Sequence, residues 1–258
     1  MTTPTPPARG ALIILEGLDR SGKTTQVKLL EQRFVELAKP VRLMRFPDRT
    51  TPIGGLIDTY LKSQTATMDD HVIHLLFSAN RWEAAGTIAK LLAEGTTVLC
   101  DRYYYSGVVY SAAKQNPSLD LGWARAPEVG LPRPDLVLFL DLSEEQARAR
   151  GGWGGEVYER GEMQRRVREL FWGLSMGKIG TEVETNGDGE GGEVAVGPPT
   201  PDRMTGLERR FRQEEEDLHV IDASPSVEEV AEEVWKVVKA RVEAVERGEV
   251  GAVVRRVS

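Results

Sequence analysis

The sequence alternates between short apolar runs and longer amphipathic stretches, and this alternation restricts the fold more than any other feature. Apolar runs predict strands at Ala11–Glu16, Val41–Phe46, Thr97–Asp101, Asp135–Asp141 and Leu218–Asp222. They lack a regular apolar/polar alternation, which is typical of strands buried on both faces. Helical patterns lie between them, at Thr24–Ala38, Asp69–Glu94, Ser143–Arg150, Glu159–Trp172 and Ser226–Val245. The sequence therefore predicts an α/β fold with a five-stranded parallel sheet flanked by helices.

The residues after the first predicted strand form a phosphate-binding motif. Gly17–Thr24 reads GLDRSGKT and matches G-x-x-x-x-G-K-[ST], with an apolar strand before it and a helical pattern after it. In such a loop, backbone N–H groups and the positive end of the helix surround a polyphosphate. Lys23 would reach the terminal phosphates and Thr24 would ligate magnesium.

A carboxylate ends the third predicted strand. Asp101 follows Val98, Leu99 and Cys100, which suits an aspartate on the magnesium side of a phosphate-binding loop. A plain strand-terminal aspartate is the alternative. Cys100 reads as a small core side chain, and as the one cysteine of the chain it cannot form an internal disulfide. This favours a reducing compartment.

Charge and hydrophobicity exclude several classes of protein. The 258 residues carry a formal net charge of -7, and a segment without Lys or Arg, Ile179–Asp202, holds six of the acidic residues. The rest of the chain is nearly neutral, so we expect no nucleic-acid partner. No apolar stretch approaches the roughly 20 residues that span a bilayer, and the first ten residues lack the features of a signal peptide. We therefore expect no membrane partner and a cytoplasmic protein, with entry into the nucleus left open.

The composition also predicts the domain organisation. One domain is expected over residues 11–246, between a flexible N-terminal tail at 1–10 and a C-terminal tail at 247–258. An acidic, glycine-rich segment at about 177–203 reads as a flexible surface insertion that is dispensable for chemistry.

The loop alone does not choose between ATPases, GTPases and small-molecule kinases. The N-K-x-D motif that reads guanine is absent, which weakens the GTPase interpretation. The loop contains Asp19, which could orient an acceptor hydroxyl, and Arg20, which could neutralise charge between donor and acceptor. Arg49 and Arg102 follow predicted strands, and fork-shaped guanidinium groups suit a second phosphate. An anionic acceptor is therefore expected.

Six segments together resemble one family. In order, they are LEGLDRSGKTTQ, RFPDRTTPIG, HLLFSANRWE, DRYYYSG, RPDLVLFLDL and VIDAS. They resemble the thymidylate kinase family, a nucleoside monophosphate kinase family with the P-loop NTPase fold, and the resemblance runs from about Arg9 to Val245. It implies transfer of the γ-phosphoryl group of ATP to dTMP, giving dTDP and ADP, in dTTP synthesis for DNA replication. It also implies a Mg²⁺ cofactor and a homodimer packed through helices.

The resemblance assigns residues to each part of the site. The implied catalytic residues are Asp19, Arg20, Lys23 and Arg102. The implied ATP-binding residues are Gly17, Arg20, Ser21, Gly22, Lys23, Thr24, Thr25 and Arg150. The implied dTMP-binding residues are Asp19, Phe46, Arg49, Phe77, Arg81, Arg102, Tyr103, Ser106, Tyr110 and Tyr158. The implied metal-binding residues are Thr24 and Asp101.

Within the implied acceptor region, at about 46–82, Arg81 and Phe77 would read and stack on thymine. Arg49 and Arg102 would bind the phosphate, and Tyr103 would crowd the sugar 2′ position. A small mobile lid is implied at about 150–165. It departs from the family pattern, because it contains the glycine-rich run GGWGG and has a valine where some relatives carry a basic residue.

Two other functions stay open at this point. One is a kinase of the same architecture that phosphorylates another nucleoside monophosphate. The other is a nucleotide-binding regulator without catalysis, which would keep the phosphate loop and lose the acceptor groups. The presence of Asp19, Arg20, Arg49 and Arg102 argues against the regulator.

Overall fold

The computed structural model describes residues 8–63, 68–150, 157–158, 161–176 and 217–258. Within these residues, five parallel strands form one sheet in the order β2-β3-β1-β4-β5. The strands are β1 (Leu12–Gly17), β2 (Val41–Arg45), β3 (Thr97–Asp101), β4 (Leu136–Asp141) and β5 (Leu218–Asp222). The predicted five-stranded parallel α/β fold is confirmed.

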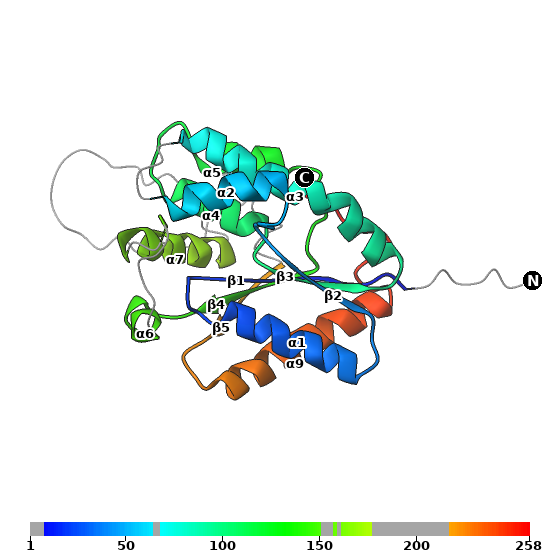
Figure 1. The fold of residues 1–258 in the computed structure, drawn as a ribbon. Helices are drawn as coiled ribbons and strands as arrows, with labels where there is room; N and C mark the ends of the chain where they lie inside the picture. The colour runs from blue at the N-terminus through cyan, green and yellow to red at the C-terminus, as the bar shows by residue number, and fades with distance from the viewer. Residues whose placement is uncertain (1–7, 64–67, 151–156, 159–160, 177–216) are drawn as a thin grey trace, which may run out of the picture.

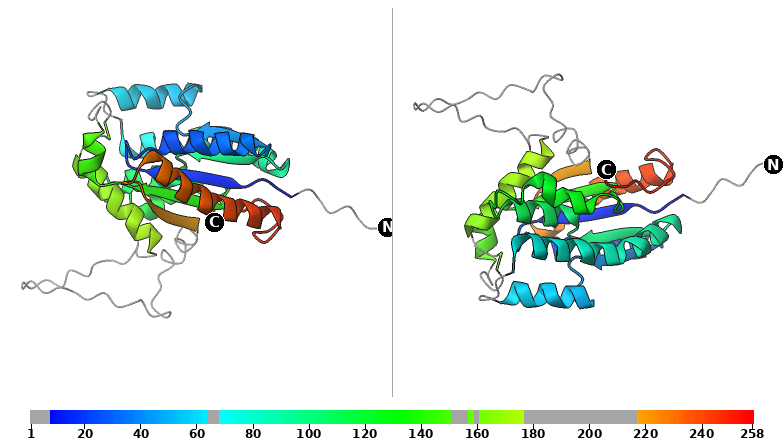
Figure 2. Two further views of the ribbon diagram at one scale, coloured as in Figure 1. Left: turned by 90° about the horizontal axis from the view of Figure 1, so that it is seen from below. Right: turned by 90° about the horizontal axis from the view of Figure 1, so that it is seen from above.

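Helices cover both faces of the sheet, as Figures 1 and 2 show. On one face lie α1 (Lys23–Glu36) and α9 (Val227–Glu246). On the other lie α2 (Pro52–Lys62), α3 (Asp70–Ala93), α4 (Tyr104–Ala112), α5 (Leu121–Arg125) and α7 (Gly161–Ser175). A 3₁₀ turn, η1 (Ala126–Glu128), follows α5, and α6 (Glu144–Ala149) follows β4. None of the helices in the described ranges is long and apolar enough to cross a membrane.

The central strand explains why the apolar runs showed no alternation. Ile13 and Leu15 of β1 pack into the core shared with α1 and α9. Leu12 and Ile14, on the opposite face, pack into the core under α3, α4 and α7. Because both faces of β1 are covered, a strand of this kind is apolar at successive positions.

Three helices, α2, α4 and the short α5, were not predicted from the sequence. In α4, tyrosines, valines and Gly107 have modest or poor helix propensity, and seven of its nine residues are buried, so its sequence shows no amphipathic period. Tertiary packing therefore determines this helix. By contrast, α2 carries a readable start signal, because Thr51 caps the Gly54 N–H at 3.0 Å and Pro52 takes the first helical position.

Described residues at both ends of the chain, assigned to tails from the sequence, contact the domain. At the C-terminal end, Val257 is buried and exchanges backbone hydrogen bonds with Gly130 and Leu131. Arg255 pairs with Asp217 at 3.1 Å. These apolar and ionic contacts dock the last residues on the domain. At the other end, Arg9, assigned to the N-terminal tail, is buried and forms a bidentate pair with Asp135.

Candidate active site

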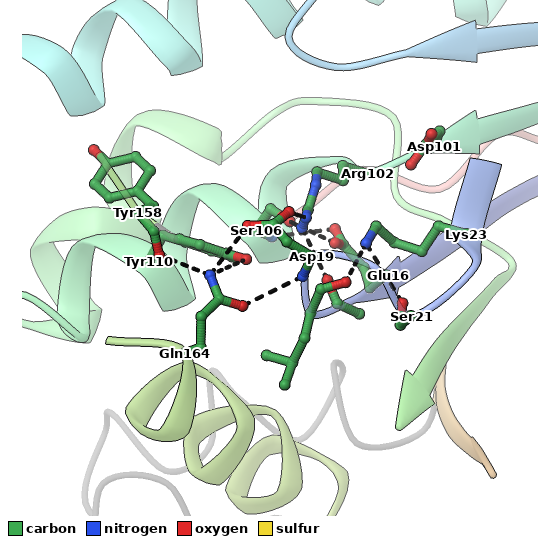
Figure 3. A network of polar contacts seen from close by, with 12 residues as sticks. Glu16, Asp19, Ser21, Lys23, Asp101, Arg102, Ser106, Tyr110, Tyr158 and Gln164 are labelled. Carbon is green, nitrogen blue, oxygen red and sulfur yellow. Dashed lines mark hydrogen bonds and ion pairs between the residues drawn. The ribbon is translucent and has the colours of Figure 1, made fainter. Parts of the chain in front are cut away.

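The phosphate loop joins the end of β1 to the start of α1. Gly22 is the N-cap of α1 and has a φ of 95°, a left-handed backbone that other residues rarely adopt. The loop backbone therefore turns directly into the helix N-terminus, where unpaired N–H groups attract anions. Lys23 folds back over the loop, and its Nζ donates to the Leu18 carbonyl oxygen at 2.5 Å (Figure 3).

Thr24 and Asp101 meet beside the loop, as their predicted shared role requires. Thr24 Oγ1 donates to Asp101 Oδ2 at 2.6 Å, because β3 lies next to β1 in the sheet. A hydroxyl and a carboxylate are ligands that suit Mg²⁺. The described residues hold no cluster of three His, Cys, Asp or Glu that could bind a metal by themselves.

One cavity lies over the phosphate loop and has a volume of about 520 Å³. It collects most of the predicted ATP-binding residues: Arg20, Ser21, Gly22, Lys23, Thr24, Thr25 and Arg150. The Arg150 guanidinium connects the phosphate loop to the residue after β5. It donates to the Arg20 carbonyl at 3.1 Å and to the Ala223 carbonyl at 2.9 Å. Gly17, the remaining predicted ATP-binding residue, does not line this cavity, although it begins the loop.

A second cavity, of about 200 Å³, opens on the other side of the loop. All ten residues predicted to bind the acceptor line it: Asp19, Phe46, Arg49, Phe77, Arg81, Arg102, Tyr103, Ser106, Tyr110 and Tyr158. The first and last of these are 139 positions apart in the chain. Folding has gathered the ten from the phosphate loop, the segment after β2, α3, the turn between β3 and α4, α4 itself and Tyr158. The sequence reasoning missed six further lining residues: Arg45, Pro47, Leu61, His74, Gly107 and Ser111.

The arginines of this cavity are held by acidic partners. Arg81 is fully buried and forms a bidentate ion pair with Glu128, with Nε to Oε2 at 2.8 Å. A side chain at Gly107 would place its Cβ 2.6 Å from Arg81 Nη2, so any larger residue there would displace the guanidinium. Arg49 pairs with Asp58 at 2.6 Å. Such pairs fix the direction in which each fork of donors points.

Arg102 lines the second cavity and contacts the phosphate loop (Figure 3). Its Nη1 donates to the Gly17 carbonyl and to Ser106 Oγ, both at 3.0 Å, and its Nη2 pairs with Asp19 Oδ1. Burial acts to raise the pKa of Asp19, but Arg102 and Lys23 outweigh it and lower that pKa. Asp19 is therefore a carboxylate at neutral pH.

Glu16 is a site residue that the sequence reasoning missed. It is fully buried at the end of β1, and its Oε1 accepts the backbone N–H groups of Tyr103 and Ser106 at 2.9 and 3.1 Å. Burial raises the pKa of Glu16 against the opposing charge of Arg102. The signal was present, because Glu16 is a charged residue at the end of an otherwise apolar run, ALIILE.

Four residues other than glycine have a left-handed backbone among the described residues. Ala38 and Gln115 follow the ends of α1 and α4, where this conformation is common. The other two are Arg20, with φ 70°, and Arg102, with φ 69°. Both were predicted to be catalytic, and strained backbone at such positions is typical of functional sites.

Lys23 predicts a pH limit for the donor side. Burial and the neighbouring Arg102 lower the pKa of Lys23 to about 8, although Asp19, Asp101 and Glu16 act in the other direction. As the pH rises through this value, the free enzyme loses the ammonium charge that binds phosphate. We expect kcat/KM for ATP to fall up to about tenfold per pH unit above pH 8, since this parameter reports the free enzyme. Lys23→Arg, which stays protonated, should remove this limb, and a parent profile that is flat to about pH 9.5 would contradict the assignment.

Comparison with known proteins identifies the family. The thymidylate kinase family model matches residues 15–182, more than half of the chain. The chain belongs to the thymidylate kinase family. Among curated thymidylate kinases, that of Arabidopsis thaliana is 53% identical over 163 residues, which cover 63% of this chain and 60% of the plant protein. The human thymidylate kinase is 48% identical over 163 residues, covering 63% of this chain and 76% of that protein.

The fold of this thymidylate kinase family member is similar to that of a solved thymidylate kinase structure. The thymidylate kinase of Candida albicans aligns with a TM-score of 0.71 and 30% identity, over 97% of this chain and 99% of that one. The family assignment made from six segments is therefore confirmed, together with the fold. Half of the predicted lid, at 151–156 and 159–160, and the insert at 177–203 lie outside the described residues.

Proposed function

We propose that this protein transfers the γ-phosphoryl group of ATP to dTMP, giving dTDP and ADP. Family membership supports dTMP phosphorylation over a different nucleoside monophosphate. The observation that carries the proposal is that residues of one phosphate loop line two cavities, and that the Asp19–Arg102 pair lines the second of them. One cavity has the cationic and backbone groups of a nucleotide-phosphate site, and the other is rich in arginine and aromatic side chains.

Each side of the loop contributes a different part of phosphoryl transfer. On the donor side, Lys23 and the α1 N-terminus neutralise ATP phosphates, and Arg150 lies at the edge of the nucleotide cavity. On the acceptor side, Arg102 and Arg49 bind the dTMP phosphate in line with the donor. Arg20, within the loop, stabilises the negative charge on the phosphoryl group during its transfer.

The Thr24–Asp101 pair fits a magnesium ion. Mg²⁺ prefers oxygen ligands and is bound through one or two protein groups plus substrate phosphates and water. The Thr24 hydroxyl and the Asp101 carboxylate, 2.6 Å apart beside the loop, supply that kind of donor set. When bound, the ion would neutralise charge on the ATP phosphates.

One experiment tests the reaction directly. Consumption of ATP is measured in a coupled assay with dTMP, dUMP, dCMP, dGMP, AMP and GMP, each with and without Mg²⁺. The proposal predicts the highest kcat/KM for dTMP and loss of turnover when magnesium is chelated. Preference for another monophosphate would support the rival kinase. No turnover, with a rise of Tm on adding dTMP, would support a regulator without catalysis.

Tyr103 is expected to select deoxyribose. Its ring is fully buried at the N-cap of α4, directly after Arg102, and lines the acceptor cavity. A 2′-hydroxyl next to the ring would meet a steric clash and lose its water, at a cost of about 1–3 kcal/mol. Tyr103→Ala should therefore lower the ratio of kcat/KM for dTMP to that for ribothymidine monophosphate by about tenfold or more.

A matched variant separates the ring from its hydroxyl. Tyr103 Oη is buried without a hydrogen-bond partner among the described residues, so Tyr103→Phe should leave the substrate ratio nearly unchanged. If Tyr103→Ala weakens both substrates equally, the ring only packs beneath the loop and the sugar-selection role is wrong.

The implied homodimer has a candidate surface on α3. Val72, Leu75 and Trp82 are apolar, partly exposed and on one side of this helix, and Val129 is exposed after η1. Large apolar side chains exposed on one side of a helix favour association of two copies through that side. Leu75→Glu should give monomers in sedimentation equilibrium. Val35→Glu, at an apolar residue exposed on α1 in the other helical layer, should leave the dimer intact. A monomeric parent would contradict the proposal.

The sequence supplies the argument for the cellular compartment of the protein. The single cysteine is buried, which agrees with a protein that does not depend on a disulfide. We propose the cytosol, with nuclear entry open, and fractionation of cells that express a tagged chain would test it.

A further inference from the structure

Gln164 connects α7 to the phosphate loop. It lies in the first turn of α7, its side chain is fully buried, and Figure 3 shows its carboxamide pointing at Asp19. Its Oε1 accepts the Asp19 backbone N–H at 3.3 Å. Its Nε2 donates to Asp19 Oδ2 at 3.1 Å and to the Tyr158 carbonyl at 2.8 Å, and it lies 3.5 Å from the Tyr110 hydroxyl.

The partners of Gln164 fix the orientation of its amide. A backbone N–H can only donate, so it requires the amide oxygen. The Asp19 carboxylate and the Tyr158 carbonyl can only accept, so they require the two protons of the amide nitrogen. Rotation of the amide by 180° would place an oxygen against two acceptors. Gln164 is therefore matched to Asp19 at both the backbone and the side chain of that residue.

Helix packing alone does not account for this glutamine. The other buried residues of α7 are apolar: Met163, Val167, Phe171 and Leu174. A buried amide is costly unless its hydrogen bonds are made, and all those of Gln164 run to Asp19, Tyr158 and Tyr110. An apolar side chain would pack in the core equally well, so the amide is explained by its hydrogen bonds to residues of the site.

Gln164 and Arg102 hold the two oxygens of the same carboxylate. Arg102 pairs with Asp19 Oδ1, and Gln164 donates to Oδ2. Arg102 also lies over the Tyr110 ring, with its guanidinium carbon 5.4 Å from the ring centroid, and the hydroxyl of that ring is the weakest contact of Gln164. Any rotation of Asp19 would therefore break a bond to one of these two residues.

We propose that Gln164 is a positioning residue that holds Asp19, and through it Arg102, in the orientation needed by the phosphoryl acceptor. The inference rests on the proposed function, since it names what sets the geometry of the same site. It places a determinant of turnover on α7, outside the phosphate loop and 145 positions away from Asp19. Gln164 contacts Asp19 and does not itself need to touch the substrate.

The kinetic test compares three variants. Gln164→Met keeps the volume and removes the amide, and should lower kcat by about 10- to 100-fold while KM for ATP changes less than about twofold. Gln164→Glu keeps one acceptor and turns the donor into an oxygen that faces Asp19 Oδ2, so its loss should be at least as large. Arg166→Met is the control on the same helix, because Arg166 pairs with Glu162 and Gln115 away from the loop. It should leave kcat within about twofold.

A double-mutant cycle shows whether Gln164 acts through Asp19. In an Asp19→Ala background, Gln164→Met should cost less than about threefold, because the group that it positions is gone. An equal loss in both backgrounds would mean that Gln164 only supports the fold of α7, and the proposal would be wrong.

A measurement without substrate keeps the inference separate from the proposed function. Amide hydrogen exchange of residues 17–24 should be about tenfold faster in Gln164→Met than in the parent and unchanged in Arg166→Met. Unchanged exchange in Gln164→Met would overturn the proposal. If the parent phosphorylates a different monophosphate, the proposed function fails, and the exchange measurement and the cycle with that acceptor still decide the role of Gln164.

Discussion

Arg102→Met is expected to lower kcat/KM for dTMP by on the order of 10³-fold, since two or more charge-assisted hydrogen bonds to the acceptor phosphate are lost. Methionine keeps much of the apolar stem and removes the guanidinium that pairs with Asp19 and donates to Gly17 and Ser106. KM for ATP should change far less, because Arg102 lines the acceptor cavity and does not line the donor cavity. Steady-state kinetics with each substrate varied in turn measures both effects.

The same variant should lose stability in a pH-dependent way. Removing the guanidinium from this partly buried ion pair should cost about 1–3 kcal/mol, because the Asp19 carboxylate loses its partner where little water can replace it. In the parent, the lowered pKa of Asp19 stabilises the fold above the unfolded-state pKa, and this contribution is lost as the pH falls. In Arg102→Met, the pKa of Asp19 rises, and that of Glu16, already raised by burial, rises further. As the pH falls, protonation of these two carboxylates removes the charges that Arg102 no longer balances. The Tm deficit of the variant should therefore be large at pH 8 and smaller at pH 5.

Calorimetry from pH 5 to pH 8 checks this, with Arg148→Met as control. Arg148 is exposed on α6 and pairs with Glu144, so its removal should cost less than about 1 kcal/mol at any pH. A Tm deficit of Arg102→Met that does not change with pH would show that Asp19 and Glu16 do not depend on this guanidinium.

Features that are local in the sequence were the ones that could be predicted. The strand, the glycine turn and the helix start of the phosphate loop are contiguous, so Gly17–Thr24 could be assigned at once. Asp101 could be placed beside the loop because it ends a strand of the same parallel sheet. The acceptor residues required the family resemblance, since nothing in the spacing of Phe46, Phe77 and Tyr158 predicts that they line one cavity.

The residues that support the site could not be read from the sequence, because each acts through a distant partner. Gln164 is separated from Asp19 by 145 positions and Glu128 from Arg81 by 47. Among many surface glutamines and glutamates, a single sequence does not show which ones are buried. The available signals were weak: Gln164 falls on the apolar side of α7, and Glu16 ends an apolar strand. Sequence patterns thus identified the groups expected to meet substrate better than the groups that hold them.

Arg20→Gly is expected to lower kcat by on the order of 10²- to 10³-fold while Tm stays unchanged or rises. Arg20 has an exposed side chain on the rim of the donor cavity and a φ of 70°, a conformation that glycine adopts without strain. The backbone of the parent therefore tolerates a cost of about 1–2 kcal/mol at this residue, and glycine relieves it. Loss of turnover without loss of stability would show that the strained backbone at Arg20 serves catalysis by its guanidinium and does not serve the fold. Rapid-quench kinetics and calorimetry on the same preparation measure the two quantities.

Three comparisons make this result specific to the guanidinium. Arg20→Ala should lose the same turnover as Arg20→Gly and lack its gain in Tm, since alanine keeps the steric cost at positive φ. Arg20→Lys should recover only part of kcat, because an ammonium lacks the planar fork that matches phosphate oxygens. Guanidinium ion at millimolar concentration should raise the turnover of Arg20→Gly and leave Arg102→Met unaffected, because glycine leaves open space at the loop surface and methionine fills the buried position. If Arg20→Ala keeps kcat within about twofold of the parent, the charge must come from elsewhere, and Arg160, outside the described residues, becomes the residue to test.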